Sequence, residues 1–290
     1  MNNQYMEKLL DILSTREIAI LFWIFFTLVV MMFSENIRQG LAQSIILLFG
    51  KKIGAILVTL TIYVFLLLFL LNKIQLWNVS LIKDTVFWYF TTAIILFFSI
   101  NKAKDNSYFK KIVAENLKWS LILEFIINFY TFSLTTELII VPTMTVLLLL
   151  QAFADTDSKH LAAKKLLEYI TGFVGLVFII YAICLTLKTY DAVFTIHNLF
   201  SFVLPPILTI LLIPFLYILA VCMNYETLFM RINFLTRDAE KRKRLKKTIL
   251  WTAKINLNHI TTIGTILNKF DLYNEDNFSL LCESIKKGIT

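Results

Sequence analysis

The chain is poor in the residues that make sharp turns, cross-links and metal sites. Its 290 residues include seven glycines, four prolines, three cysteines and three histidines. No CxxC pair is present, so the sequence supports neither a disulfide framework nor a structural zinc site. GxSxG, HExxH, GxGxxG and Walker phosphate-loop motifs are also missing. We therefore expect a protein that is not an enzyme and that holds no cofactor.

Apolar residues, in contrast, are abundant. Hydrophobic residues make up 58% of the sequence, and the mean hydropathy is +0.73. Soluble domains contain about 45–50% apolar residues, and a single globular core cannot bury the excess found here. A lipid bilayer solvates such a surface directly. We predict an all-α, polytopic transmembrane helical bundle.

Seven long windows with few charged residues define the predicted spans. The windows cover residues 18–33, 53–71, 85–100, 117–135, 138–154, 166–187 and 199–223. Only a short turn without a basic residue separates the fourth from the fifth. This pattern divides the chain into a transmembrane bundle (1–223) and a basic, helical cytoplasmic tail (224–290).

The distribution of Lys and Arg predicts the orientation. If successive loops alternate between the two sides, one side carries 5 of the 28 basic residues and the side with the tail carries 23. Because basic residues stay in the cytoplasm, we expect an external N-terminus and a cytoplasmic C-terminus. No cleavage site follows the first apolar run, so we expect that run to remain as an anchor. The excess of Lys over Arg is typical of an AT-rich bacterial gene, and we expect a multi-pass protein of the bacterial cytoplasmic membrane.

Two of the predicted cytoplasmic loops contain amphipathic segments. In residues 34–52 an apolar stripe precedes Gly50 and two lysines, which predicts an elbow helix in the membrane interface. A re-entrant half-helix that lines a pore is the alternative. In residues 101–118, one apolar face predicts anchoring on the membrane surface; it consists of Tyr108, Phe109, Ile112, Val113 and Leu117. Docking of a partner protein is the alternative there.

The tail carries a cluster of basic residues. Its members are Arg237, Lys241, Arg242, Lys243, Arg244, Lys246 and Lys247. We interpret the cluster as a topology signal that also contacts anionic lipids. A cytoplasmic protein partner is the second interpretation, and nucleic acid is disfavoured because no recognised motif accompanies the charge. The tail is small for an independent domain, so we expect it to pack on the bundle, on a partner or on its own copies.

Three polar residues are candidates for an ion, proton or polar-cavity site. Glu124 lies well inside the fourth predicted span, and Asn128 follows four residues later on the same helical face. An acid in lipid is neutralised, paired or exposed to water. Glu124 is therefore either a proton- or cation-responsive group or a protonated acid bound to a neighbouring helix. Glu137, at the outer end of the next hairpin, is the third candidate, with helix capping as the simpler alternative.

Prolines interrupt two of the predicted spans. Pro142 lies in the fifth, and Pro205, Pro206 and Pro214 lie in the seventh. Because proline removes a backbone N–H and kinks a helix, these positions are hinge candidates. Static kinks explain them equally well.

One short loop offers weak candidates for a metal site. Asp155, Asp157 and His160 lie close together in the sequence and carry ligand types that a divalent ion accepts. Asp157 also precedes a predicted helix at a capping position. Capping is the interpretation that we favour, and we predict no metal.

Taken together, these features favour a non-enzymatic membrane subunit that acts by assembly. It would form a homo-oligomeric channel or a membrane effector or sensor, in an accessory bacterial system such as phage defence. The alternative is a proton- or ion-coupled secondary transporter that uses Glu124, although the chain has few glycines and no internal repeat. An intramembrane lipid-modifying enzyme, built around Asp155, is the third possibility.

Overall fold

A computed structural model describes residues 13–116, 118, 130–188, 195–236, 238–267 and 280–285. These residues form α-helices joined by short 3-10 and π-helical segments, and no strand occurs among them. Six of the described helical segments are long and apolar enough to cross a membrane. The prediction of an all-α, polytopic helical membrane protein is thus confirmed.

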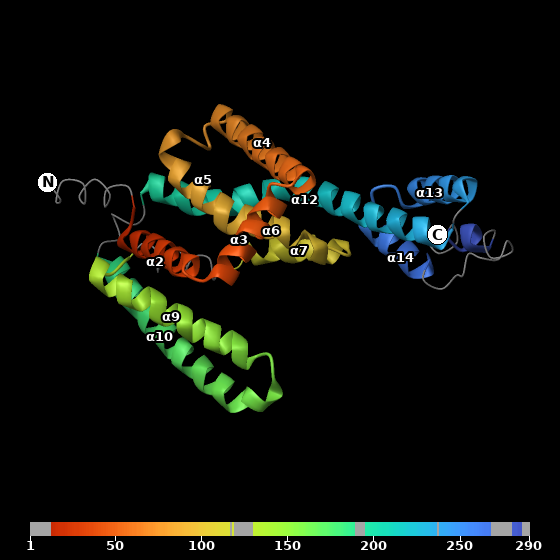
Figure 1. The fold of residues 1–290 in the computed structure, drawn as a ribbon. Helices are drawn as coiled ribbons and strands as arrows, with labels where there is room; N and C mark the ends of the chain where they lie inside the picture. The colour runs from red at the N-terminus through yellow and green to blue at the C-terminus, as the bar shows by residue number, and fades with distance from the viewer. Residues whose placement is uncertain are drawn as a thin grey trace. The chain divides into compact units, whose positions relative to one another are not determined.

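Each of the six segments overlaps a predicted span (Figure 1). They are α2 (Thr15–Met32), α4 (Lys51–Lys73), the composite segment Val79–Lys102, α9 (Leu134–Ala154), α10 (Leu161–Lys188) and Asn198–Phe234, which belongs to α12 (Ile196–Leu235). The predicted span 117–135 lies largely outside the described residues. The total of seven spans and their orientation therefore stay predictions.

Side-chain caps fix where several helices begin. Ser14 accepts a hydrogen bond from the backbone N–H of Glu17 at 3.3 Å, and Glu17 returns one to the backbone N–H of Ser14 at 2.7 Å. This reciprocal capping box starts α2. Ser133 caps α9 in a similar way, and Asp238 caps α13 (Ala239–Ala253). The backbone N–H groups of the first helical turn have no partner within the helix, and these caps supply one. The position where each helix begins is therefore encoded in the local sequence.

The chain divides into two compact units. In the first, α9 and α10 form an antiparallel hairpin, and α2 packs along α9 (Figure 1). The Oγ1 of Thr171 on α10 donates to the Oε1 of Gln151 on α9 at 3.3 Å. At the start of α2, the Oγ1 of Thr15 donates to the backbone oxygen of Phe132 at 2.7 Å. The helices α2 and α9 therefore begin at the same end of this unit.

The second unit is built around α12. The composite segment beside it consists of η1 (Val79–Leu81), α5 (Ile82–Trp88), the π-helical η2 (Tyr89–Ala93), α6 (Ile94–Phe98) and η3 (Ile100–Lys102). On α12, buried apolar residues recur four positions apart on both sides of Asn224: Leu204, Leu208, Leu212, Leu216 and Ala220 before it, and Leu228 and Ile232 after it. This spacing forms one ridge of the kind that packs between neighbouring helices. At the predicted boundary between residues 223 and 224 the ridge is interrupted by Asn224, which is half-buried, and it resumes at Leu228.

The tail packs on the C-terminal part of α12. Its helices α13 and α14 (Leu257–Leu267) contact each other (Figure 1). Buried side chains from α12, α13, α14 and residues 280–285 form their common core: Leu228, Ile232, Leu245, Ile249, Ala253, Leu257, Ile260, Ile263, Leu267, Leu281 and Ile285. Burial of a Leu or Ile side chain contributes roughly 1.5–3 kcal/mol. The tail thus finds its apolar partner within its own chain.

The two amphipathic loop segments have different surroundings. The helix α3 (Glu35–Leu48) has no buried residue, which leaves its apolar face accessible, as an elbow helix in the membrane interface requires. In α7 (Asn106–Glu115), Phe109 and Ile112 are instead buried, and the Phe109 ring lies 5.3 Å from that of Tyr217 on α12. The expected membrane anchoring is wrong for these two side chains. Amphipathic spacing identifies an apolar face but does not distinguish lipid from protein as its neighbour.

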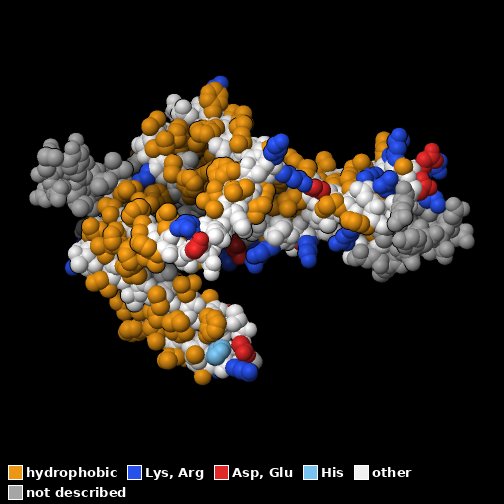
Figure 2. Space-filling view, viewed as in Figure 1, with side chains coloured by type: hydrophobic (Ala, Val, Ile, Leu, Met, Phe, Trp, Pro, Cys, Tyr) orange, Lys and Arg blue, Asp and Glu red, His pale blue; other side chains and the backbone are white. Residues whose placement is uncertain are grey.

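Figure 2 shows the chemical character of the surface. Hydrophobic side chains cover the long helices, and Lys and Arg side chains gather over α13. On α10, only Ala182 and Thr186 are buried among its 28 residues. Such apolar exposure is incompatible with water over most of these helices and agrees with a membrane environment.

Candidate functional site in the α12 core

Helix α12 contains three prolines inside one continuous helix of 40 residues. Each proline removes a backbone N–H from the helical hydrogen-bond ladder, and its ring crowds the preceding turn. In a membrane, backbone groups near a proline need neighbouring helices or side-chain hydroxyls as partners. Side-chain hydroxyls reach backbone oxygens in the turns around Pro205 and Pro214.

A threonine links the first proline turn to α5. The Oγ1 of Thr209 donates to the backbone oxygen of Pro205 at 2.8 Å and accepts a hydrogen bond from the Nε1 of Trp88 at 2.9 Å. Both Thr209 and Trp88 are buried. The indole N–H and the hydroxyl thus satisfy each other in an apolar core, where an unpaired polar group costs several kcal/mol.

A tyrosine links the second proline turn to α4. The hydroxyl of Tyr63 donates to the backbone oxygen of Leu211 at 2.9 Å, and its ring stacks on Phe215 with 5.1 Å between the ring centres. Pro214 lies between these two α12 residues. The hydroxyl of Tyr89, in the π-helical segment, shares a hydrogen bond of 2.7 Å with the Oγ1 of Thr61 on α4. Short π-helical segments are frequent at functional sites.

These contacts consist of neutral hydroxyl, indole and carbonyl groups. Such groups hold helices at fixed positions and can exchange partners when a helix moves, but they carry no charge for an ion. These contacts therefore hold α12 against α4 and α5 through hydrogen bonds that can exchange partners. Pro205, Pro206 and Pro214 stay hinge candidates.

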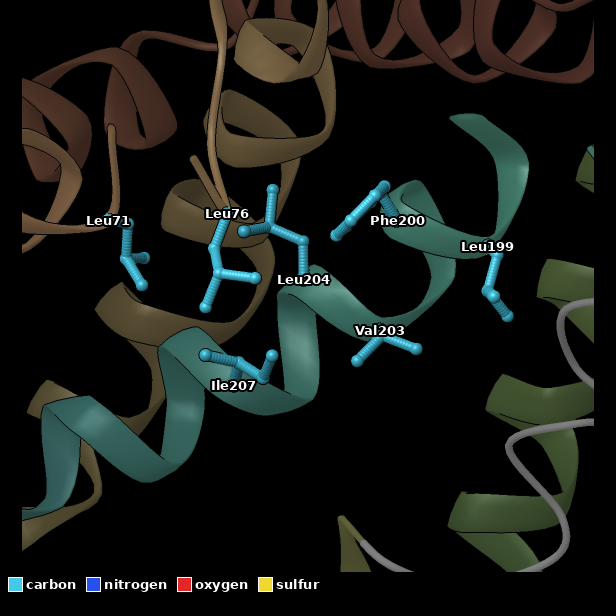
Figure 3. Close-up of a pocket in the computed structure, with 7 residues that line it drawn as sticks. All are labelled: Leu71, Leu76, Leu199, Phe200, Val203, Leu204 and Ile207. Carbon is cyan, nitrogen blue, oxygen red and sulfur yellow. The ribbon is translucent and has the colours of Figure 1, made fainter. Parts of the chain in front are cut away.

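An apolar cavity of about 220 Å³ lies at the N-terminal end of α12 (Figure 3). Its lining consists of Leu71 from the end of α4, Leu76 from the following turn, and Leu199, Phe200, Val203, Leu204 and Ile207 from α12. The volume is below the roughly 300–1,000 Å³ of typical small-molecule sites. Because aliphatic and aromatic side chains alone line it, the cavity suits a hydrocarbon chain better than an ion or a sugar.

In the first unit, Glu137 forms a buried ion pair with Arg16. The Nη2 of Arg16 donates to the Oε1 of Glu137 at 3.1 Å, and the Nε donates to the Oε2 at 3.3 Å. The same Oε1 accepts the backbone N–H of Phe132 at 3.0 Å. The side chain of Glu137 is fully buried. This bidentate geometry fixes the orientation of the guanidinium and of the carboxylate. The pair therefore joins the start of α2 to the start of α9.

Next to this pair, Trp23 compensates for a proline. The Nε1 of Trp23 on α2 donates to the backbone oxygen of Leu138 at 2.9 Å. In an unbroken helix, the residue four positions later donates to this oxygen, but that residue is Pro142, which has no N–H. The indole therefore takes the place of the missing donor and favours a static role for Pro142.

The loop between α9 and α10 holds the weak metal candidates. The carboxylate of Asp155 accepts a hydrogen bond from the Nζ of Lys164. The Oδ1 of Asp157 accepts the backbone N–H of Lys159 at 3.0 Å, as the capping interpretation predicts. Among the described residues, no group of three or more His, Cys, Asp and Glu side chains is arranged to hold a metal ion.

Three candidates from the sequence lie outside the described residues: Glu124, Asn128 and Arg237. The other basic candidates, Lys241, Arg242, Lys243, Arg244, Lys246 and Lys247, all belong to α13. Of these, Lys246 contacts α12, because its Nζ donates to the Oδ1 of Asn233 at 3.0 Å and lies 5.4 Å from the centre of the Phe229 ring.

Sequence reasoning did not identify Arg16, Trp88 or Thr209 as partners. A signal existed for Arg16, because the predicted topology places it and Glu137 on the same side of the membrane. No comparable signal exists for the Trp88–Thr209 contact, since 121 residues separate the two in the chain. No protein-family model matches this chain, and no curated protein or solved structure matches it either.

Proposed function

We propose that this protein is a non-enzymatic membrane effector or sensor that acts as an assembly of copies. In this proposal, α12 couples the state of the tail to the state of the membrane-embedded helices. The observation that carries it is the ridge of buried residues along the single helix α12, which packs among spans at one end and in the tail core at the other, with half-buried Asn224 between the two parts.

The geometry of the ridge supports mechanical coupling. Leu208 and Leu212 are buried beside the proline turns, and Leu228 and Ile232 are buried in the tail core. All four lie on one continuous α-helix. The protein core around each end of α12 is packed nearly as densely as a crystal. A rotation or shift of one end of the helix therefore displaces the other end. Pro214, which lies between the two pairs, supplies a position where the helix can bend during such a movement.

The assembly part of the proposal is supported by the exposed apolar surfaces. Phe173 and Leu166 on α10 are 69% and 61% exposed. Surfaces of this kind accept lipid or the same helix of a second copy. The distribution of basic residues supports the bacterial cytoplasmic membrane as the location, with the tail in the cytoplasm. A channel formed by several copies is the specific version of the proposal that we would test first.

The experiment reconstitutes the full-length chain in liposomes. We expect native mass spectrometry to detect oligomers, and planar-bilayer recordings or dye release to detect permeation. Protein that stays monomeric and gives neither current nor release would refute the proposal.

Coupling is tested with two substitutions on the same helix. Ile232→Ala removes a buried side chain from the tail core and is expected to destabilise it by about 2–5 kcal/mol. Phe234→Ala is the matched control, because Phe234 is 86% exposed. We expect a changed current or release only for Ile232→Ala. Loosened tail packing, detected by hydrogen exchange, together with unchanged activity would contradict the coupling.

A further inference from the structure

The turn between α13 and α14 is held against α12 by two tyrosines. The hydroxyl of Tyr225 donates to the backbone oxygen of Lys254, and that of Tyr217 donates to the backbone oxygen of Ile255 at 2.9 Å. In the middle of α13, Lys246 contacts Asn233. Along α12 the contacts thus run from residue 233 back to residue 217, so α13 is antiparallel to α12 and returns toward the spans.

The position of Tyr217 on α12 places this turn at the edge of the bilayer. From Leu199, at the start of the apolar stretch, Tyr217 is roughly 27 Å along the helix axis, while the hydrocarbon layer is about 30 Å thick. Asn224 is the first amide of the following polar stretch, and its Nδ2 donates to the backbone oxygen of Ala103 at 3.3 Å. Exposed Lys102 and Lys104 flank Ala103, as expected at a lipid headgroup layer.

Large apolar side chains project from this turn. Leu250 is 48% exposed, Trp251 73% and Ile255 65%. Exposed Lys247 and Lys254 lie among them. We call Lys247, Leu250, Trp251, Lys254 and Ile255 the α13–α14 corner. Tryptophan with aliphatic residues and lysines is the composition of segments that lie in a membrane interface.

The backbone of the α13–α14 corner is held in an unfavourable conformation. Lys254 has φ 47° and ψ −125°, in a region that residues other than glycine rarely adopt. Such a conformation persists only where surrounding contacts impose it. Here the two tyrosine hydroxyls bind the adjacent carbonyl oxygens and direct Lys254 and Ile255 outward.

We infer that the α13–α14 corner is a membrane-contact site for anionic lipid. The side chains of Leu250, Trp251 and Ile255 insert at the level of the glycerol backbone and upper acyl chains. Lys247 and Lys254 bind lipid phosphate groups. The corner is bound to Tyr217 near the end of the apolar stretch of α12 and carries charge complementary to anionic headgroups, and these two features favour a lipid surface over a protein as the occupant.

The site has a consequence for the tail as a whole. A tail attached to the membrane at this corner responds to the charge of the lipid around it. Each lysine near an anionic surface shifts the equilibrium between the membrane-bound and the unbound tail by about fivefold. This inference concerns the surface of the tail and does not depend on whether the protein conducts ions.

The test uses the full-length chain with Cys184, Cys222 and Cys282 replaced by serine. A single cysteine is introduced as Leu250→Cys or, as the matched control, as Phe234→Cys, and is labelled with the fluorophore NBD. Phe234 is exposed and lies roughly 25 Å from Tyr217 along α12. The protein is placed in nanodiscs that contain phosphatidylcholine with or without phosphatidylglycerol, and with or without a lipid that carries a nitroxide high in its acyl chain.

We expect the label at position 250 to be quenched at least threefold more by the nitroxide lipid than the label at position 234. Quenching by aqueous iodide should be stronger for the label at position 234 than for the label at position 250. Equal quenching by iodide at the two positions would overturn the inference. A shielded label at position 250 without quenching by the nitroxide lipid would also overturn it, because a protein surface would then be the occupant.

The anionic component is tested with Lys254→Gln and Lys243→Gln. Both lysines are exposed on the tail, but they are about 16 Å apart along the chain direction of α13, which exceeds the Debye length of about 8 Å at physiological salt. Lys254→Gln should reduce the effect of phosphatidylglycerol on nitroxide quenching about fivefold, and Lys243→Gln should leave it nearly unchanged. Equal effects of the two substitutions, or no dependence on phosphatidylglycerol, would contradict a specific lipid site.

Discussion

Replacing Glu137 with glutamine tests whether the buried ion pair joins α2 to α9. The substitution keeps the shape of the side chain and one oxygen for the backbone N–H of Phe132, which Glu137 accepts at 3.0 Å. It removes the negative charge that faces the Arg16 guanidinium at 3.1 Å. The guanidinium then faces a neutral amide instead of a carboxylate.

The expected loss in the free energy of unfolding follows from the geometry of the ion pair. Two unit charges roughly 4 Å apart, at an effective dielectric constant of about 20, interact by about 4 kcal/mol. Removing one partner of a buried pair commonly costs about 3–5 kcal/mol. Because the Arg16 side chain is 19% exposed, it can regain some hydration by moving toward water. We therefore expect Glu137→Gln to lower the free energy of unfolding by about 3 kcal/mol.

Equilibrium unfolding in mixed micelles, followed by circular dichroism, measures this change. Arg16→Gln should have a similar effect, and the double substitution should cost clearly less than the sum of the two. Glu168→Gln is the control, since the pair of Glu168 with Lys164 at 3.8 Å is exposed and its loss should change stability by less than about 0.5 kcal/mol. A loss below about 1 kcal/mol for Glu137→Gln, or strict additivity, would refute the reasoning.

Three further predictions concern other parts of the chain. Trp23→Phe should lower the unfolding free energy by about 1 kcal/mol, and by less in a Pro142→Ala background, because alanine donates its own N–H to Leu138. The hydrogen bond from Ser107 lowers the pKa of Asp105, which caps α7. The stabilising effect of the ionised cap is therefore present at neutral pH and is lost only as the pH falls below the ordinary aspartate range. Hydrogen exchange of α7, corrected for intrinsic rates, would detect this loss. If the protein is instead a coupled transporter, Glu124→Gln should abolish proton-driven uptake in liposomes, and unchanged uptake in this variant would remove the main support for that alternative.

The helical elements were largely predictable from the sequence. In lipid, each backbone N–H must be satisfied within its own segment, so a long apolar window without charges has to form a helix. The predicted windows 53–71 and 138–154 differ from α4 and α9 by only a few residues at their ends. The helix α12 continues to Leu235, twelve residues beyond the predicted span 199–223, because the change to polar residues after position 223 does not end a helix.

The partners of the polar residues were less predictable. Glu137 stood out as an acid near a span, but its pairing with Arg16 depends on how α2 and α9 pack, which spacing along the chain does not encode. The amphipathic face of α7 was evident, yet its neighbour is Tyr217 of the same chain rather than lipid. Both questions concern contacts between segments that are far apart in sequence.

The sequence alone determined the solvent of this protein, its helical class and the approximate limits of the described spans, because these depend on local composition and on backbone hydrogen bonding. The tertiary structure decided which carbonyls beside the prolines receive side-chain donors, that a buried ion pair joins two helices, and that the tail folds back along α12. These features require side chains from distant segments to meet at hydrogen-bonding distance, and only the packing of the helices brings them together.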